Sequence, residues 1–200
     1  MNLFSVILFL VIFGVFGTLV YTTQQNSSKT VTIPTVAVQA ISPTAQGKAM
    51  QATPSATQDM KASYSAVIQT TKGDISLTLF AKDAPNTVKN FVTKAKAGYY
   101  SNLTFHRVED WVLQGGDPLG NGTGGGNMPT ELNKLPFVKG ALGVARGGDI
   151  RISNDSQFFI TKSDASWLNG QYTNFGQVTD GMDVVMKMTV GDKILGITVK

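Results

Sequence analysis

From residue 64 onward, apolar and polar positions alternate in short runs that turn residues separate. The runs Tyr64–Gln69 and Ile75–Phe80 flank the polar segment Thr71-Lys72-Gly73-Asp74, which predicts a β-hairpin. Further strands are predicted at Thr104–Val108, Trp111–Gln114, Ala141–Ala145, Phe158–Thr161, Asn174–Val178 and Ile194–Val199. Many short strands with turn signals between them favour an all-β domain.

Two segments follow a helical period instead. Pro85–Ala97 carries one apolar stripe, starts with a proline that suits the first helical turn, and is followed by Gly98. Met182–Met188 predicts a second, shorter helix. Short strands combined with two helices predict a closed antiparallel barrel with helical caps.

The first 63 residues have a different character. Leu3–Val20 is almost entirely apolar and has about the length that crosses a hydrocarbon core of roughly 30 Å as a helix. No Lys or Arg precedes it and no A-x-A-like site follows, so we expect a transmembrane anchor at residues 1–21, with a cleaved signal peptide as the alternative. Residues 22–63 are rich in Thr, Ser, Gln, Ala and Pro and predict a flexible linker.

This layout predicts one domain, at residues 64–200. We expect it to be membrane-anchored and extracytoplasmic, or secreted if the N-terminal segment is cleaved. The orientation is inferred from the layout, because the few charges near the apolar run say little about it.

Composition excludes several classes of function. The chain has no Cys and one His, which rules out disulfides, thiol catalysis, Cys-ligated metals and multi-histidine sites. Its net charge is +4, but residues 64–200 carry 14 Lys and Arg against 12 Asp and Glu. A near-neutral domain lacks the basic footprint of a nucleic-acid-binding protein, so we expect no nucleic acid. Composition leaves metal sites built from carboxylates open, but we expect no metal and no cofactor.

Two motifs could indicate a nucleotide-binding site or a hydrolase, but their sequence context does not support either function. Gly120–Gly125 matches G-x-G-x-x-G, but Met128-Pro129 follows at once and no parallel-sheet pattern surrounds it. A loop beside a bound peptide and a purely structural glycine loop are the remaining interpretations. A hydrolytic triad around His106 is disfavoured because no G-x-S-x-G elbow exists, and the adjacent Arg107 disfavours the charged form of His106, which favours a structural role.

The most informative stretch is Phe105–Asp117, which reads FHRVEDWVLQGGD. It sets Arg107 and Gln114 among strand-forming residues, and alone it also fits a surface ion pair beside an interior aromatic. SQFFI at 156–160 and WLNGQYTNFG at 167–176 follow in order. With them the sequence resembles the cyclophilin family from Tyr64 to about Lys200. The resemblance implies a closed eight-stranded antiparallel barrel capped by two α-helices, and peptidyl-prolyl cis–trans isomerase activity.

The resemblance also assigns the site. Arg107 matches the catalytic arginine, which suits a permanently protonated donor to the twisted amide nitrogen, and Gln114 matches the substrate-positioning amide. The proline pocket corresponds to Trp111, Val112, Phe159 and Leu168. The remaining groove positions correspond to His106, Ala145, Arg146, Gln157, Trp167 and Tyr172.

The chain departs from the family pattern in places. The spacing from Arg107 to Gln114 is one residue shorter than usual, and Trp111 stands where phenylalanine is typical. Arg146-Gly147 replaces an Asn-Ala pair and Tyr172 replaces His, as in bacterial relatives. The loop Gly147–Asp155 also differs in length and sequence.

The expected partners are proline-containing segments of unfolded or exported proteins, the membrane through the N-terminal helix, and cyclosporin-type cyclic peptides. The main alternative is a non-catalytic proline-peptide-binding or scaffolding domain. A stalked hydrolase is a third, weaker interpretation.

Overall fold

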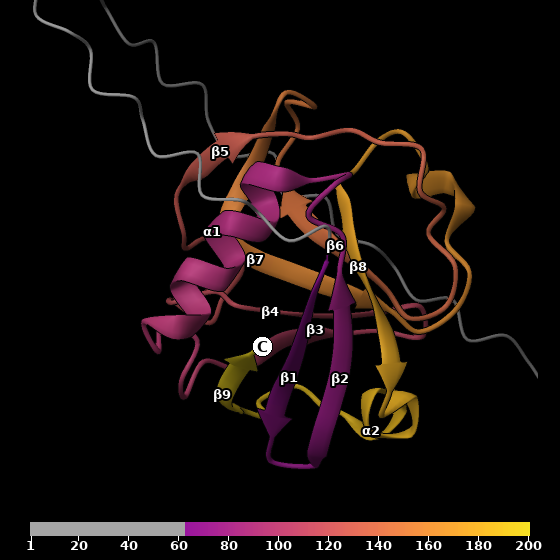
Figure 1. Cartoon of the computed structure of the whole chain (residues 1–200). Coiled ribbons are helices and arrows are strands. Elements are labelled where there is room, and N and C mark those ends of the chain that lie inside the picture. Colours follow the sequence, from indigo (N-terminus) through magenta and orange to yellow (C-terminus); the bar gives the residue numbers. More distant parts are fainter. Residues whose placement is uncertain (1–62) are drawn as a thin grey trace, which may run out of the picture. The chain divides into compact units, whose positions relative to one another are not determined.

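The computed structural model describes residues 63–200 (Figure 1). The predicted anchor at 1–21 and nearly all of the predicted linker at 22–63 lie outside the described residues. Within residues 63–200, no helix is long and apolar enough to cross a membrane.

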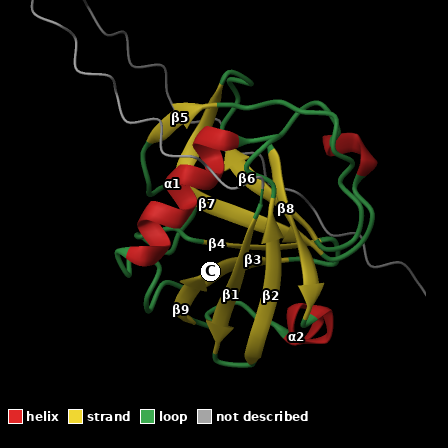
Figure 2. Ribbon diagram, in the orientation of Figure 1, coloured by secondary structure: helices red, strands yellow, loops and turns green. Residues whose placement is uncertain are grey.

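Nine strands form one antiparallel sheet (Figures 1 and 2). They are β1 Tyr64–Thr70, β2 Gly73–Leu79, β3 Phe105–Val108, β4 Val112–Gly115, β5 Asn127–Pro129, β6 Ala141–Arg146, β7 Ile152–Thr161, β8 Asn174–Asp180 and β9 Ile194–Val199. The spatial order is β3-β4-β7-β6-β8-β2-β1-β9, and β5 pairs with β7 off this path. The all-β prediction is therefore confirmed, with nine strands in place of eight.

The predicted hairpin is present between β1 and β2. Thr70 pairs with Gly73 across the two-residue turn Thr71-Lys72. Gly73 has a φ of 130°, a conformation that side chains with a Cβ rarely adopt. The turn glycine therefore allows the chain to reverse directly between the two strands.

The predicted barrel closure is not a continuous ladder in the described residues. The segments at the two end strands, β3 and β9, meet at an isolated bridge between Thr104 and Lys193, with backbone hydrogen bonds on both sides of it, such as those from Phe105 to Asp192 at 2.9 Å and from Ile194 to Leu103 at 2.8 Å. β3 has four residues, and its register with β4 shifts between Phe105 and Arg107, so it is too short and irregular for a second full ladder. The architecture is a half-barrel with two helices.

Strand β7 is much longer than the predicted Phe158–Thr161. Its first half, from Ile152 to Gln157, is largely polar and pairs with the unpredicted β5. Such a segment lacks the apolar alternation that marks a strand in a sequence. Its regular backbone depends on pairing with a distant segment.

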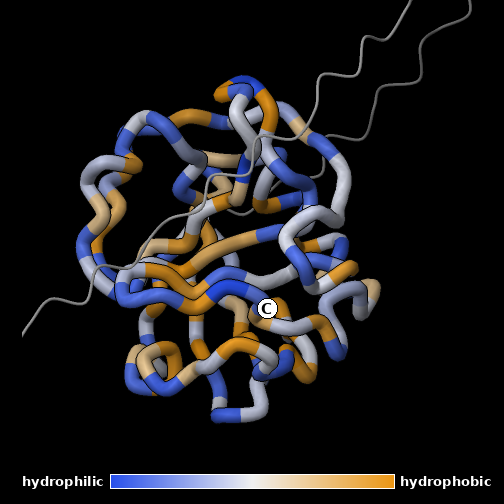
Figure 3. Tube along the Cα trace, turned by 180° about the vertical axis from the view of Figure 1, so that it is seen from behind, coloured by the Kyte–Doolittle hydropathy of each residue, from blue (hydrophilic) through white to orange (hydrophobic). Residues whose placement is uncertain are grey.

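Both predicted helices are present, as α1 (Pro85–Lys96) and α2 (Met182–Lys187). α1 packs against β9 and β7, and α2 packs against β2 (Figure 1). A short 3₁₀ helix at Ser166–Leu168 was not predicted. The interior segments are mainly hydrophobic and the peripheral loops mainly hydrophilic (Figure 3).

The buried side chains form two separate clusters. The larger one includes the buried residues of α1 and contains Leu113 and Phe158. Their sequence neighbours Val112 and Phe159 belong to the smaller one. Because successive side chains of a strand point to opposite faces, the smaller cluster lies on the other face of β4 and β7.

Candidate active site

The smaller cluster forms the floor of a pocket. Its buried members are Val112, Phe137, Ala141, Phe159, Ala165 and Leu168, with Trp111 and Tyr172 packed against them. The ring of Phe159 stacks on Phe137 at 5.7 Å between centroids and meets Tyr172 edge to face at 5.8 Å. These contacts fix the orientation of the Phe159 ring, which makes the centre of the floor apolar.

The pocket itself has a volume of about 150 Å³. It is lined by Arg107, Trp111, Val112, Gln114, Ala145, Arg146, Phe159, Leu168 and Tyr172. All nine residues are among those that the resemblance assigned to the site. An apolar floor with two guanidinium groups and one amide at its rim suits a small apolar ring attached to a polar backbone.

Strand pairing places the key residues in one row across the sheet. Arg107 of β3 faces Gln114 of β4, Gln114 faces Phe159 of β7, and Phe159 faces Gly143 of β6. Cross-strand neighbours of this kind have Cβ atoms about 5 Å apart. The row therefore sets a cation and an amide directly beside the apolar floor.

Arg107 is held by two neighbouring side chains. Its Nε donates to Glu109 Oε1 at 2.7 Å and its Nη2 to Glu109 Oε2 at 3.1 Å, while its Nη1 donates to Gln114 Oε1 at 3.3 Å. The hydrogen bonds from Arg107 are the main reason that the pKa of Glu109 is below its ordinary value. Arg107 thus has a defined direction although its side chain is 42% exposed.

Gln157 lies outside the pocket but supports it. Gln114 Nε2 donates to Gln157 Oε1 at 3.0 Å, and Gln157 Nε2 donates to the carbonyls of Gly122 at 3.1 Å and Gly124 at 2.8 Å. These bonds orient the Gln157 amide and, through it, the Gln114 amide. The glycine-rich loop thus supports the pocket through the backbone carbonyls of Gly122 and Gly124.

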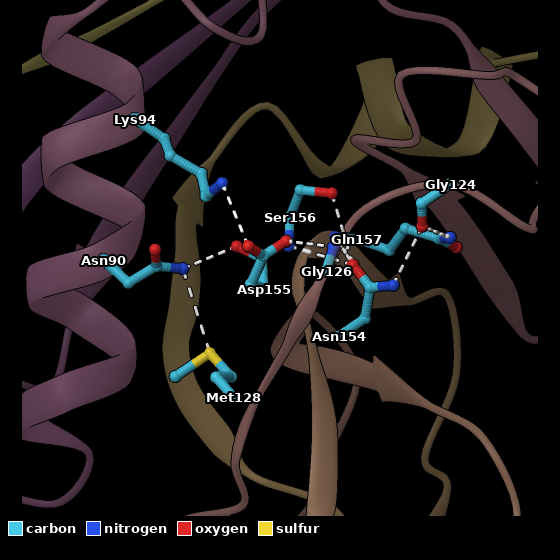
Figure 4. A network of polar contacts seen from close by, with 9 residues as sticks. All are labelled: Asn90, Lys94, Gly124, Gly126, Met128, Asn154, Asp155, Ser156 and Gln157. Carbon is cyan, nitrogen blue, oxygen red and sulfur yellow. Dashed lines mark hydrogen bonds and ion pairs between the residues drawn. The ribbon is translucent and has the colours of Figure 1, made fainter.

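A polar network behind Gln157 ties this region to α1 (Figure 4). Asn154 Oδ1 accepts hydrogen bonds from the backbone N–H groups of Ser156 at 2.9 Å and Gln157 at 2.8 Å. Asp155 accepts the N–H of Gly126 at 2.7 Å and pairs with Lys94 of α1 at 3.3 Å. The backbone N–H groups in the polar half of β7 therefore find hydrogen-bond acceptors on side chains as well as in the sheet.

Two of the departures from the family pattern form one contact. The guanidinium of Arg146 lies over the ring of Tyr172 at 4.4 Å, a cation–π distance. Arg146 also donates to the carbonyls of Gln171 and Gly147, both at 2.9 Å. The two replacements therefore act as a pair that lines one wall of the pocket.

Trp167 and His106 do not line the pocket. Trp167 is 59% exposed and its ring meets Trp111 edge to face at 5.6 Å, so it extends the aromatic surface beyond the rim. Neither ring nitrogen of His106 has a hydrogen-bond partner within residues 63–200, and both are shielded from solvent. Burial lowers the pKa of His106, the carboxylate of Asp117 opposes this, and Arg107 adds to it. His106 therefore fits the structural role better than contact with substrate.

Asp117 anchors the loop beside His106. Its carboxylate accepts the backbone N–H groups of Leu119 at 3.0 Å and Asn121 at 2.9 Å, together with that of Gly122. Burial alone would raise the pKa of Asp117, but these hydrogen bonds hold the pKa below its ordinary value.

Sequence reasoning missed several residues that contact the predicted site residues. Glu109 and Phe137 were not identified. A second groove of about 400 Å³ shares Gln114, Ala145 and Arg146 with the pocket and is also lined by Gln157, all four of which the resemblance assigned, but its other lining residues were not identified. The closeness of Glu109 in sequence to Arg107, with opposite charge, was a local signal for Glu109. Phe137 lies in a segment without strand or helix periodicity, so its place in the floor had no local signal.

Comparisons with known proteins agree with this geometry. Residues 65–195 match the family model described as "Cyclophilin type peptidyl-prolyl cis-trans isomerase/CLD". The chain is 46% identical over 129 residues to the peptidyl-prolyl cis-trans isomerase cypE of Dictyostelium discoideum, covering 60% of this chain and 81% of that protein. It is 43% identical over 139 residues to a peptidyl-prolyl cis-trans isomerase of Synechococcus elongatus, covering 67% of this chain and 94% of that protein.

Solved structures show the same fold. A crystal structure of a cyclophilin-type peptidyl-prolyl cis-trans isomerase of Cryptosporidium parvum superposes with a TM-score of 0.65 at 31% identity, covering 69% of this chain and 98% of that one. A second crystal structure of that protein, obtained in the presence of the dipeptide Ala-Pro, has a TM-score of 0.64 at 31% identity and covers 68% of this chain and 98% of that one.

Proposed function

This chain belongs to the cyclophilin-type peptidyl-prolyl cis–trans isomerases, and on that premise we propose that Arg107 and Gln114 carry the isomerisation of X–Pro bonds. The supporting observation is the row in which these two residues stand beside the buried ring of Phe159. A proline ring in the pocket would bring its amide bond next to the guanidinium.

Rotation of an X–Pro bond must overcome a barrier of about 20 kcal/mol, because amide resonance is lost in the twisted state. The nitrogen then regains a lone pair that accepts a hydrogen bond. A guanidinium has five N–H groups, and in the described residues three of those of Arg107 are used by Glu109 and Gln114. The other two, one on each Nη, are available for the amide nitrogen, and the permanent charge of Arg107 needs no acid–base partner.

Gln114 has a complementary role. Its Oε1 accepts from Arg107 and one Nε2 hydrogen goes to Gln157, so its second Nε2 hydrogen is available for the carbonyl oxygen of the residue before proline. Gln114 can hold the carbonyl oxygen while the proline ring stays in the pocket and the bond between them rotates. The pocket thereby favours the twisted state over either planar ground state.

A non-catalytic proline-binding or scaffolding domain would keep the same pocket. The two functions differ in turnover, since only an isomerase accelerates the cis–trans exchange. Isomerisation of a proline-containing peptide, measured for the wild-type chain and for Arg107→Ala, therefore distinguishes the enzyme from a binding domain. Unchanged peptide binding with strongly reduced turnover supports the enzymatic role of Arg107, whereas turnover that does not depend on Arg107 contradicts it.

The cellular setting is also part of the proposal. We propose that residues 1–21 anchor the protein in a membrane, that residues 22–63 tether the domain, and that the domain acts outside the cytoplasm on exported proteins. The support is the apolar run Leu3–Val20 followed by a polar, Pro-containing stretch.

Cyclosporin-type cyclic peptides are proposed as ligands of the same groove. The exposed Trp167 beside Trp111 offers an aromatic edge next to the proline pocket, which suits a largely apolar cyclic peptide. The Arg146–Tyr172 pair supports a groove of the bacterial type, with a cation on one wall.

A further inference from the structure

We propose that Glu109 is a positioning residue for isomerisation, which aims the Arg107 guanidinium at the substrate and at the same time fixes the indole of Trp111 at the pocket rim. This inference rests on the proposed catalytic role of Arg107. It assigns a function to the shortened segment between Arg107 and Gln114, which the resemblance left without one.

The local backbone brings the three side chains together. β3 ends at Val108 and β4 begins at Val112, so three residues form the hairpin loop, and the Glu109 N–H donates to the Val112 carbonyl at 2.9 Å to close it. The Trp111 carbonyl accepts the N–H of Lys162 at 2.8 Å, which ties the loop to the end of β7. The loop folds so that the Glu109 carboxylate lies within hydrogen-bond distance of both the Arg107 guanidinium and the Trp111 indole.

One carboxylate serves both neighbours on this face. Glu109 accepts two hydrogen bonds from Arg107 in the two-pronged geometry that is the strongest and most directional arrangement for these groups. Its Oε2 also accepts the indole N–H of Trp111 at 3.0 Å. The guanidinium carbon lies 5.2 Å from the centre of the Trp111 ring, so cation, carboxylate and indole form a closed triangle.

The triangle decides which Arg107 donors face the pocket. Glu109 takes the Nε edge of the guanidinium, which directs the opposite Nη1 corner toward Gln114 and the pocket. Without Glu109, the half-exposed arginine would keep one hydrogen bond of 3.3 Å, from Nη1 to Gln114, as its only side-chain hydrogen bond to the described residues. A long side chain with so few restraints samples several rotamers and spends less time in the reactive orientation.

Charge alone does not explain the arrangement. Asp110 is adjacent in sequence and carries the same charge, but in the described residues no hydrogen bond or ion pair joins it to Arg107, which pairs with Glu109 instead. Arg151 and Asp149 form another ion pair between residues two apart, at 2.8 Å. The Arg151 side chain is 84% exposed and does not line the proline pocket. These two positions provide matched controls.

The first test compares Glu109→Ala, Glu109→Gln and Asp110→Asn in the full chain, with kcat and KM for a proline-containing peptide and the melting temperature of each variant. We expect Glu109→Ala to lower kcat about 5- to 20-fold with little change in KM. The variant loses a partly exposed ion pair that orients Arg107, but it keeps the arginine itself. Glu109→Gln should fall between, since its amide oxygen still accepts from Arg107 but its NH₂ repels a second donor. Asp110→Asn should match the wild type.

A second test uses pH and an epistasis comparison. As pH falls through the pKa of Glu109, which lies below its ordinary 4.5, wild-type kcat should drop, and Glu109→Gln should lack that inflection while Asp110→Asn retains it. In the Arg107→Ala background, adding Glu109→Gln should cause no further loss, because a residue that acts through Arg107 has nothing left to position.

The outcomes distinguish this inference from the proposed function. A Glu109→Ala variant with wild-type kcat, whether or not its melting temperature falls, would show that Glu109 only stabilises the loop. Losses that multiply in the double variant would show that Glu109 acts independently of Arg107. If Arg107→Ala itself retains wild-type turnover, it is the catalytic assignment of Arg107 that fails.

Discussion

Phe159 and Gly143 face each other in register across β7 and β6, and the ring of Phe159 occupies the space that a side chain at position 143 would need. A Cβ built on Gly143 would overlap that ring and would also lie 2.7 Å from the ring of Phe137. The floor of the proline pocket therefore depends on the absence of a side chain on the neighbouring strand.

This contact predicts a linked pair of variants. Phe159→Ala should lower the free energy of unfolding by about 3–5 kcal/mol, because it leaves a cavity in a buried cluster, and should raise KM for a proline peptide. Gly143→Ala should cost about 1–3 kcal/mol through overpacking and should also reduce kcat/KM. Denaturant unfolding and steady-state kinetics measure both effects.

The double variant provides the check on this explanation. With Phe159→Ala present, the methyl group at position 143 enters the space left by the ring, so the two stability losses should sum to more than the loss in the double variant. Gly148→Ala, where a Cβ meets nothing within 4 Å, is the control for stability. Strict additivity would show that the overlap does not limit Gly143.

Arg107→Ala should reduce kcat/KM roughly 100- to 1000-fold, which corresponds to about 3–4 kcal/mol of transition-state stabilisation from one aimed donor. Most of the loss should appear in kcat. Its melting temperature should change little, since a partly exposed ion pair contributes at most about 1 kcal/mol. Arg151→Ala removes the same kind of ion pair elsewhere on the surface, and near-wild-type turnover is expected for it. Equal effects of the two variants would contradict the assignment.

The stability of the protein should depend on pH through His106. Burial lowers the pKa of the folded-state imidazole below its ordinary 6.5, so the unfolded chain binds the proton first. The contribution to stability is complete above about pH 6.5 and is lost as pH falls through the folded-state pKa.

Denaturant midpoints from pH 8 to pH 5 measure this effect. His106 is the only histidine of the chain, so few other groups titrate in that range. His106→Gln should remove most of the slope of stability against pH, whatever its effect on absolute stability. An unchanged slope in that variant would assign the pH dependence to other groups.

The proposed anchor predicts a specific fractionation pattern. The full chain should sediment with membranes, and a chain beginning at residue 22 with an added start methionine should be released from them, because the apolar run is the only proposed anchor. In intact cells, an added protease should digest the domain at the cell surface or, in a cell with an outer membrane, after that outer layer is opened. Protection until the cytoplasmic membrane is permeabilised would contradict an extracytoplasmic domain.

Cyclosporin-type peptides should bind and change the intrinsic tryptophan fluorescence. The chain has two tryptophans, and Trp111 and Trp167 lie 5.6 Å apart at the groove, so a ligand there alters the environment of both. Trp167→Phe should weaken the affinity more than it weakens turnover of a short peptide. No fluorescence change at high micromolar ligand would count against binding.

Much of the fold was predictable because the signals are local. In β1, β2, β9 and α1, every second residue or one helical stripe faces the same core. The buried positions of each segment can therefore be recognised from its own sequence. The resemblance, which depends on the ordered segments around Arg107, Phe159 and Trp167, then assigned all nine residues of the pocket.

Other features depend on contacts between distant segments. The first half of β7 is polar, and it is a strand because β5 and the side chain of Asn154 satisfy its backbone. Phe137, in a loop, stacks on Phe159, in β7. The hydrophobic pattern of neither segment predicts this contact. Such pairings are set by packing and hydrogen-bond satisfaction across the whole domain.

The sequence by itself determined the strands with an apolar face and the two α-helices, because alternation and helical period are properties of short segments. The order of its motifs supported the resemblance that assigned the residues lining the pocket. Only the tertiary structure decided that the sheet is a half-barrel of nine strands, that Gly143 makes room for Phe159, and that Glu109 holds both Arg107 and Trp111. Those relationships are distances between side chains, and they exist only once the backbone has brought the strands into register.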